Sequence, residues 1–264
     1  MATVIGKPGK SAAEMAMKER GKIIAIVMLA IFVIGAMEGL VLASYIPANW
    51  ISGVMRLPLV CLLSLILFTG TRWGRRRVDS LERKRANYLC GVRGEVFVGR
   101  NLEDLPEDFF IINDLATLQG NLDHVVIGPT GVFILDTKNW RGVVKADTNG
   151  ELLLNDKPTD GQEIQQFTAR LMGIREKIQT LAPGTNQFFQ GLFVFTSARV
   201  EAKWGTTKSV RCITDEQLID HILDDKSVSR IQPTVVNAIA KAFGALKTME
   251  QDFGANSLPT PPVP

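Results

Sequence analysis

Three residues with the chemistry of a metal-dependent hydrolytic site lie close together in the chain: Asp123, Asp136 and Lys138. Apolar runs on both sides of a Gly-Pro-Thr-Gly sequence predict a β-hairpin between the two acids. The four-residue turn pairs Ile127 with Val132, and the same register places Asp123 directly across from Asp136. Side chains alternate between the two faces of a strand, so Lys138 joins Asp136 on one face. A slip of one residue would separate the acids.

Two carboxylates that face each other repel unless a positive group lies between them. A divalent cation meets this need, because oxygen ligands suit Mg²⁺ and Mn²⁺. A lysine beside them could stabilise negative charge developing on phosphate, or orient and deprotonate a water. Alternatively, both acids lie in solvent at strand ends and the lysine is a bystander. Residues 125–127 and 133–135 are apolar on both faces, which favours central strands whose ends line a site.

The histidines and cysteines of the chain do not fit the common kinds of metal site. The chain has two histidines, His124 and His221, far apart in sequence, and three cysteines with no Cys-x-x-Cys pair. A zinc site built from these ligands is not expected, and neither is a disulfide framework, which favours a reducing compartment. His124 alternates to the face opposite Asp123, so we expect a core or supporting histidine rather than a ligand.

Several segments together carry a resemblance to a known family. They are Gly94-Glu95 in a predicted helix, the block 121–142, the pair Gln165-Gln166 and a core strand at residues 192–197. In these segments the sequence resembles the nuclease-related domain (NERD) family, which is assigned to the restriction-endonuclease-like PD-(D/E)xK superfamily. The resemblance covers roughly residues 90–225.

The resemblance implies roles for five residues. Glu95 would be a helix-borne acid, Asp123 the main metal ligand and Asp136 the second acid. Lys138 would be the catalytic lysine, and Gln166 would assist. The three acids would hold Mg²⁺ or Mn²⁺, and the substrate would be nucleic acid, with DNA as the first expectation. Asp136 stands where many members carry Glu, so its carboxylate is one methylene shorter.

Taken singly, most of these residues also have simpler interpretations. Glu95 would be a solvated helix residue, and Gln166 an amide on a helix surface. Trp140 and Gly142 are expected to shape the turn into the next strand, rather than to stack on a base. Arg141 could contact phosphate, but a solvated arginine is an equal alternative.

The elements that must position these residues are short strands interleaved with helices. Helices are predicted over residues 74–100, 160–181 and 232–249, and another begins after Thr214, its expected N-cap. Strands are predicted at residues 109–113, 122–127, 132–136, 143–146, 151–154, 191–196 and 210–213. This order predicts an α/β domain, and the resemblance implies a restriction-endonuclease-like mixed central sheet flanked by helices.

The first seventy residues predict a membrane anchor. Two apolar runs, residues 23–45 and 51–71, each carry one charge, and each is close to the roughly 20 residues that a spanning helix needs. Lys and Arg flank the outer ends and are absent from the short loop, so both termini are expected in the cytoplasm of a bacterial-type inner (plasma) membrane. A secretory signal peptide is the competing interpretation, but the first run is long for one and a second run follows.

Two charges and one basic segment belong to this anchor. The break at Pro47 places Glu38 and Arg56 at the same depth, where they would form a salt bridge or both reach the outer interface. The basic juxtamembrane helix at residues 72–90 could contact anionic lipid headgroups or nucleic-acid phosphates. We favour the lipids, because the segment adjoins a span.

The predicted organisation is a cytoplasmic segment at 1–22, a transmembrane hairpin at 23–71, a juxtamembrane helix at 72–90, a nuclease-like domain at 91–225, a C-terminal helix at 226–250 and a disordered tail at 251–264.

The leading hypothesis is a Mg²⁺-dependent phosphodiesterase that acts on DNA at the membrane. The alternative is a catalytically inactive, membrane-tethered module that binds nucleic acid or protein; a homo-oligomer formed through the hairpin is a further possibility. The acid–acid–lysine set favours the enzyme. The lack of a strongly basic stretch between residues 101 and 225 counts against the enzyme, because nucleic-acid affinity rests largely on positive charge.

Overall fold

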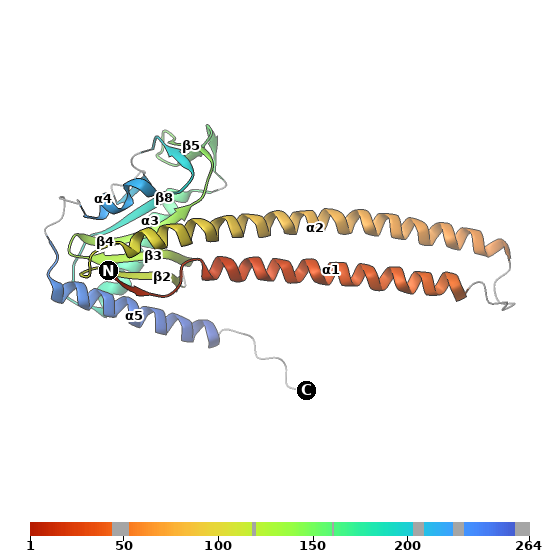
Figure 1. Ribbon diagram of the computed structural model, residues 1–264, viewed down its shortest axis with the longest axis horizontal. Helices are drawn as coiled ribbons and strands as arrows, with labels where there is room; N and C mark the ends of the chain where they lie inside the picture. Colours follow the sequence, from red (N-terminus) through yellow and green to blue (C-terminus); the bar gives the residue numbers. More distant parts are fainter. Residues whose placement is uncertain (44–52, 118–119, 160, 203–208, 224–229, 257–264) are drawn as a thin grey trace. The chain divides into compact units, whose positions relative to one another are not determined.

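The computed structural model describes residues 1–43, 53–117, 120–159, 161–202, 209–223 and 230–256 (Figure 1). The chain divides into two compact units. One unit is Ala12–Leu89, and the other combines Met1–Ser11 with Cys90–Pro264. The first eleven residues therefore belong to the same unit as the predicted nuclease-like domain.

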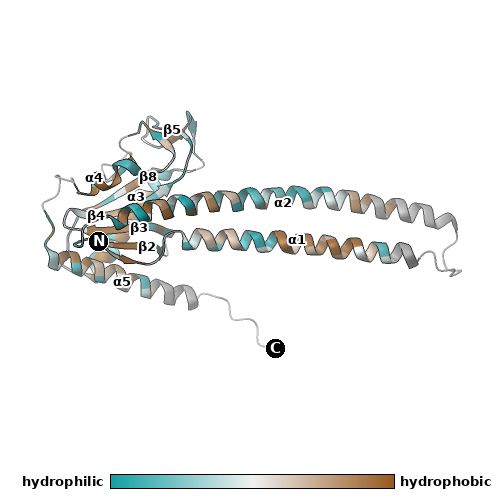
Figure 2. Ribbon diagram, viewed as in Figure 1, coloured by the Kyte–Doolittle hydropathy of each residue, from teal (hydrophilic) through white to brown (hydrophobic). Residues whose placement is uncertain are grey.

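Helix α1 (Lys10–Ala43) carries the first predicted span. Over Lys10–Gly39 it is long and apolar enough to cross a membrane, and its most apolar stretch is not buried. Large side chains such as Ile24, Leu29 and Phe32 are exposed, and Figure 2 shows this hydrophobic band along the helix. Of the helices that the structure describes, α1 alone meets this criterion, which an N-terminal signal sequence also meets.

Helix α2 (Gly53–Glu103) joins the second predicted span to the predicted basic helix without a break. The continuity follows from the absence of proline after Pro58, since nothing else in the segment removes a backbone donor. Ile34 of α1 and Leu67 and Val78 of α2 line one cavity, so the two helices pack together within the first unit. The side chain of Arg56 lies outside the described residues, and its pairing with Glu38 stays a prediction.

The second unit is built on a mixed six-stranded sheet with the order β1-β2-β3-β4-β8-β10. Strands β2, β3 and β4 are antiparallel, whereas β1 pairs with β2, β8 with β4 and β10 with β8 in parallel. The strands are β1 (Thr3–Ile5), β2 (Phe110–Thr117), β3 (Gly120–Gly128), β4 (Gly131–Lys138), β8 (Phe189–Phe195) and β10 (Val210–Thr214). This arrangement confirms the predicted mixed central sheet.

Strand β1 was missed by the sequence analysis, which assigned residues 1–22 to a separate segment. Val4 pairs with Ile111 of β2, and the N–H of Thr3 donates to the carbonyl of Phe109 at 3.0 Å. A strand of three residues is too short to show alternation, and it stands just before a strongly apolar run. The pairing identifies the N-terminus as an edge of the sheet.

A smaller four-stranded sheet follows the hairpin, in the order β7-β6-β5-β9. Its strands are β5 (Gly142–Ala146), β6 (Leu152–Leu154), β7 (Lys157–Pro158) and β9 (Ala198–Val200). Ala146 pairs with Leu152 in antiparallel β5 and β6, which confirms the hairpin predicted from Asn149-Gly150.

Helices cover both faces of the central sheet, as predicted. On one face α3 (Glu163–Leu181) and α5 (Pro233–Asn256) share a core with the sheet that contains Phe167, Phe193 and Phe243. On the other, the C-terminal part of α2 and α4 (Leu218–Leu223) pack against residues such as Phe133. Replacing one such phenylalanine by alanine typically costs about 3–5 kcal/mol. Helix α5 continues to Asn256 rather than ending near residue 250, and residues 257–264 of the predicted tail lie outside the described residues.

Candidate active site

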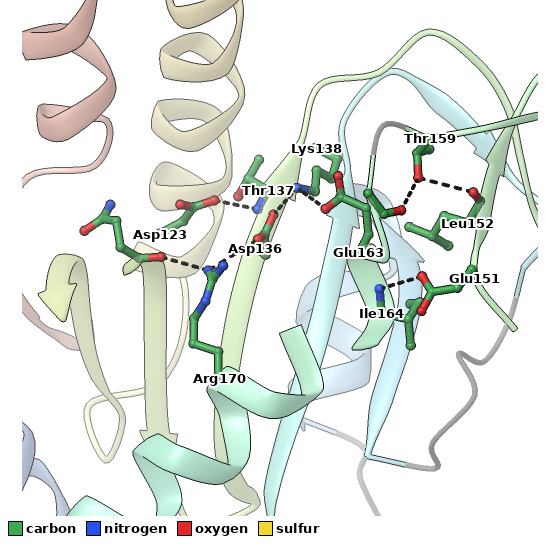
Figure 3. Close-up of polar contacts among 12 residues, drawn as sticks. Asp123, Asp136, Thr137, Lys138, Glu151, Leu152, Thr159, Glu163, Ile164 and Arg170 are labelled. Atoms are coloured by element: carbon green, nitrogen blue, oxygen red, sulfur yellow. Dashed lines mark hydrogen bonds and ion pairs between the residues drawn. The ribbon is translucent and has the colours of Figure 1, made fainter. Parts of the chain in front are cut away.

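The predicted hairpin has the expected register. Ile127 pairs with Val132, and the ladder continues to His124 and Leu135. Asp123 and Asp136 are the next residues on the two strands. There the Oδ2 atom of Asp123 accepts a hydrogen bond of 2.7 Å from the backbone N–H of Thr137 (Figure 3). Asp123 is thus fixed to the β4 backbone beside Asp136.

Glu95 comes from α2, and a glycine lets that helix approach the sheet. A Cβ atom on Gly94 would lie 3.1 Å from Cβ of Asn139 and 3.3 Å from Cγ2 of Thr137. Such contacts are tighter than most real Cβ contacts. Glu95, the next residue, is 8% exposed, and its Oε2 has no hydrogen-bond partner among the described residues. The helix therefore brings a buried carboxylate to the end of β4.

The three predicted acids affect one another's titration. Burial, followed by the charges of Asp114 and Asp136, raises the pKa of Glu95 from 4.5 to about 7. Burial also raises the pKa of Asp123, and the charges of Asp136 and Glu95 add to it. The hydrogen bond from Thr137 opposes that rise. A site that raises carboxylate pKa values in this way favours a proton or a cation.

Lys138 lies between two carboxylates. Its Nζ atom is 3.0 Å from Oδ1 of Asp136 and 3.0 Å from Oε2 of Glu163 (Figure 3). The rings of Trp140 and Phe193 lie 5.7 Å and 5.4 Å from the same atom. Burial alone would lower the pKa of Lys138, but the charges of Asp136 and Glu163 outweigh it and raise the pKa. Lys138 is therefore a cation near neutral pH.

Three residues that the sequence analysis did not select also lie here. Glu163 and Arg170 stand seven positions apart on α3, so two helical turns place them on one face toward Asp136. The Nη1 atom of Arg170 donates to the carbonyl of Asn121 at 3.1 Å and lies 3.9 Å from Oδ2 of Asp136. Asp114 on β2 is the third. Only the helical spacing could have identified the α3 pair in advance.

Gln166 does not join this group in the structure. It is exposed on α3, and no side-chain hydrogen bond within the described part of the chain links it to the acids. The face of α3 that meets the sheet is instead occupied by Glu163, Phe167 and Arg170. Its assisting role stays a prediction.

The structure also places the other residues of the block 121–142 that were considered above. His124 is fully buried, with Nδ1 2.7 Å from Oδ1 of Asn113, and burial lowers its pKa to about 4 despite the charge of Asp114. Trp140 packs on Phe195 with ring centroids 5.6 Å apart. Gly142 has a φ of 118°, a conformation that favours glycine. Arg141 is exposed.

As they stand, the described His, Cys, Asp and Glu side chains include no group of three that could hold a metal ion. The donor chemistry nevertheless suits a hard cation, because Glu95 presents a buried oxygen without a partner. Asp136 is engaged by Lys138. If Asp136 also served as a metal ligand, the ion would compete with Lys138 for its carboxylate.

Comparisons with known proteins identify this part of the chain. Residues 91–196 match the family model of the nuclease-related domain (NERD). An uncharacterized protein of Bacillus anthracis is 34% identical over 71 residues, which are 25% of this chain and 34% of that protein, so the chain spans about a third of its relative. No solved structure matches the chain. Residues 91–196, which contain every acid and the lysine predicted above, therefore form a nuclease-related domain of the NERD family.

Proposed function

We propose that this chain is a membrane-anchored, metal-dependent nuclease that hydrolyses phosphodiester bonds, with DNA as its substrate. The observation that supports this most is the convergence of Glu95, Asp123 and Asp136 from α2, β3 and β4 beside Lys138. These residues lie within a nuclease-related domain. Buried acids with raised pKa values and a lysine between carboxylates are typical of sites that do chemistry.

Glu95, Asp123 and Asp136 would hold Mg²⁺ or Mn²⁺. The ion, when bound, would lower the pKa of a coordinated water and polarise the phosphate. The Thr137 N–H holds one oxygen of Asp123, which leaves the other free to serve as a ligand. Glu95 would contribute its unpartnered Oε2.

The cations of the site would act on the substrate. Because Lys138 stays protonated near neutral pH, we assign it to stabilising charge on the phosphate and orienting the attacking water, rather than to removing a proton. Arg170, on the other side of Asp136, would contact a phosphate oxygen. Gln166 is exposed on the same helix and would meet the substrate there.

The anchor would confine this activity to a membrane surface. Helix α1 would span a bacterial-type inner membrane, and the first part of α2 would return as the second span with both termini in the cytoplasm. The basic residues 72–90 of α2 would lie against anionic headgroups. The enzyme would then act on nucleic acid that reaches the membrane.

One observation favours a second candidate, an inactive tethered module that binds nucleic acid or protein. Asp136 and Glu163 form ion pairs with Lys138, and Arg170 lies 3.9 Å from Asp136, so lysine and arginine balance these two acids. A domain that binds a partner without catalysing a reaction would have acids whose charges are already balanced by lysine and arginine in this way.

One assay separates the two candidates. The full-length protein in detergent is incubated with plasmid, linear and single-stranded DNA and with RNA, in Mg²⁺, Mn²⁺ or EDTA. The nuclease predicts cleavage of DNA that EDTA abolishes. Binding without cleavage under every condition would support the inactive module, and cleavage of RNA alone would change the substrate.

A further inference from the structure

Glu163 shares the ammonium group of Lys138 with Asp136. Both carboxylates lie 3.0 Å from Nζ (Figure 3). Asp136 comes from β4, whereas Glu163 comes from the first turn of α3. The roles implied by the family resemblance do not include Glu163, and its contact with Lys138 is the reason to consider one.

This ion pair differs from an ordinary surface pair. The side chains of Lys138 and Glu163 are 19% and 28% exposed, whereas those of the surface pair Lys145–Asp156 are 39% and 73% exposed. Partly buried pairs are screened less by water and salt than exposed ones. The rings of Trp140 and Phe193 further confine the ammonium group.

The backbone that carries Glu163 is also fixed. The carboxylate of Glu151 accepts hydrogen bonds of 3.0 Å from the N–H groups of both Ile164 and Gln165. These are backbone donors at the start of α3 that the helix itself cannot satisfy. Glu151 therefore caps the turn that presents Glu163 to Lys138.

We propose that Glu163 is a positioning residue for Lys138, an inference that rests on the proposed nuclease function. Lys138 has two anionic partners, but Asp136 is also a candidate metal ligand. If Asp136 held a metal ion, Glu163 would still restrain the ammonium group of Lys138. Without Glu163, the flexible four-carbon side chain of Lys138 would lose its second restraint at the moment when it is needed.

The test is a double-mutant cycle on cleavage by the full-length protein, with Glu163→Gln, Lys138→Met and the double variant. Misplacing a catalytic group costs roughly 10- to 100-fold in rate. We expect Glu163→Gln to lower kcat by this order with little change in KM, and to cause no further loss in the Lys138→Met background. Glu176→Gln, an exposed change on the same helix, is the matched control and should leave kcat unchanged.

A purely structural role gives a different pattern. Glu163→Gln would then lower the thermal midpoint and lower kcat by the same factor with Lys138 present or absent, and that additivity would overturn the proposal. Wild-type kcat in Glu163→Gln would overturn it as well, while leaving the nuclease function intact. If the wild-type protein cleaves no nucleic acid with any metal, the proposed function fails first, and this role fails with it.

Discussion

The backbone N–H of Ser11 donates a hydrogen bond of 3.0 Å to Oδ2 of Asp114, which joins the start of helix α1 to strand β2. The other oxygen, Oδ1, accepts from Nδ2 of Asn121 at 2.7 Å. Close by, a backbone hydrogen bond from Gly9 lowers the pKa of Glu95, against the larger effects that raise it. Gly9 and Ser11, where α1 begins, thus contact acids of the candidate site.

Loss of the Asp114 carboxylate should lower the stability of the domain. Its φ of 53° is a left-handed conformation that asparagine tolerates better than alanine. We expect Asp114→Ala to destabilise the domain by about 2 kcal/mol, from a lost helix cap and backbone strain. Asp114→Asn should cost less than half of that. Thermal unfolding of the full-length protein measures both, and an Asp114→Ala protein as stable as wild type would contradict this role.

Stability should fall as pH rises through the titration of Glu95. Its pKa is raised from 4.5 to about 7, so the folded protein favours the protonated form. This contribution to stability is complete below about pH 4.5 and is lost as pH rises to about 7. Glu95→Gln should therefore stabilise the metal-free protein at pH 8, by at most about 3 kcal/mol, and have little effect at pH 4.

The measurement is the thermal midpoint at both pH values, in EDTA. Glu176→Gln, which removes an exposed carboxylate, is the control and should change neither midpoint. A lower thermal midpoint of Glu95→Gln at pH 8 would contradict this prediction. It would mean that burial and the neighbouring acids do not destabilise the ionised Glu95 carboxylate. The same variant should also be inactive, because a stabilising substitution at a site commonly removes function.

Gly91 and Gly94 both lie in α2 but differ in the space around them, so the same substitution can be compared at the two positions. A Cβ atom on Gly94 would crowd Asn139 and Thr137, whereas on Gly91 it would meet only Oε1 of Glu95 at 3.9 Å. In a helix, alanine is favoured over glycine by roughly 0.5–1 kcal/mol. Gly91→Ala should therefore stabilise the protein, and Gly94→Ala should destabilise it and reduce cleavage by moving Glu95. Equal effects of the two substitutions in unfolding experiments would show that the close approach at Gly94 does not matter.

Much of the fold follows from local patterns in the sequence. The turn between Ile127 and Val132 has a length that fixes the register of β3 and β4, and apolar strands on both faces indicate a sheet covered by helices. The apolar run of α1 is visible from composition alone. These features depend on neighbours in sequence, so a single chain reveals them.

The remaining features depend on contacts between distant segments. No residue near Thr3–Ile5 indicates that this strand pairs with β2. Asp114 accepts from the N–H of Ser11 only because the fold brings together residues that are far apart in the sequence. Gln166 was taken from the resemblance, whereas Glu163 was not selected, because the face that α3 presents to Asp136 is set by packing of the whole helix. The structure brings the three acids near Lys138 and leaves Gln166 exposed on α3, and the roles that the resemblance implies for these residues stay predictions.

The central claim is that the cluster around Asp123 cleaves DNA with a divalent metal. The most direct test compares Mg²⁺-dependent plasmid cleavage by full-length wild type, Asp123→Asn and the control Asp156→Asn, whose exposed carboxylate pairs with Lys145 at 2.8 Å outside the cluster. Loss of a metal ligand commonly removes most of the activity. We predict that Asp156→Asn cleaves like wild type and that Asp123→Asn loses at least about 100-fold in rate while remaining folded. Wild-type cleavage by folded Asp123→Asn would contradict the proposed site.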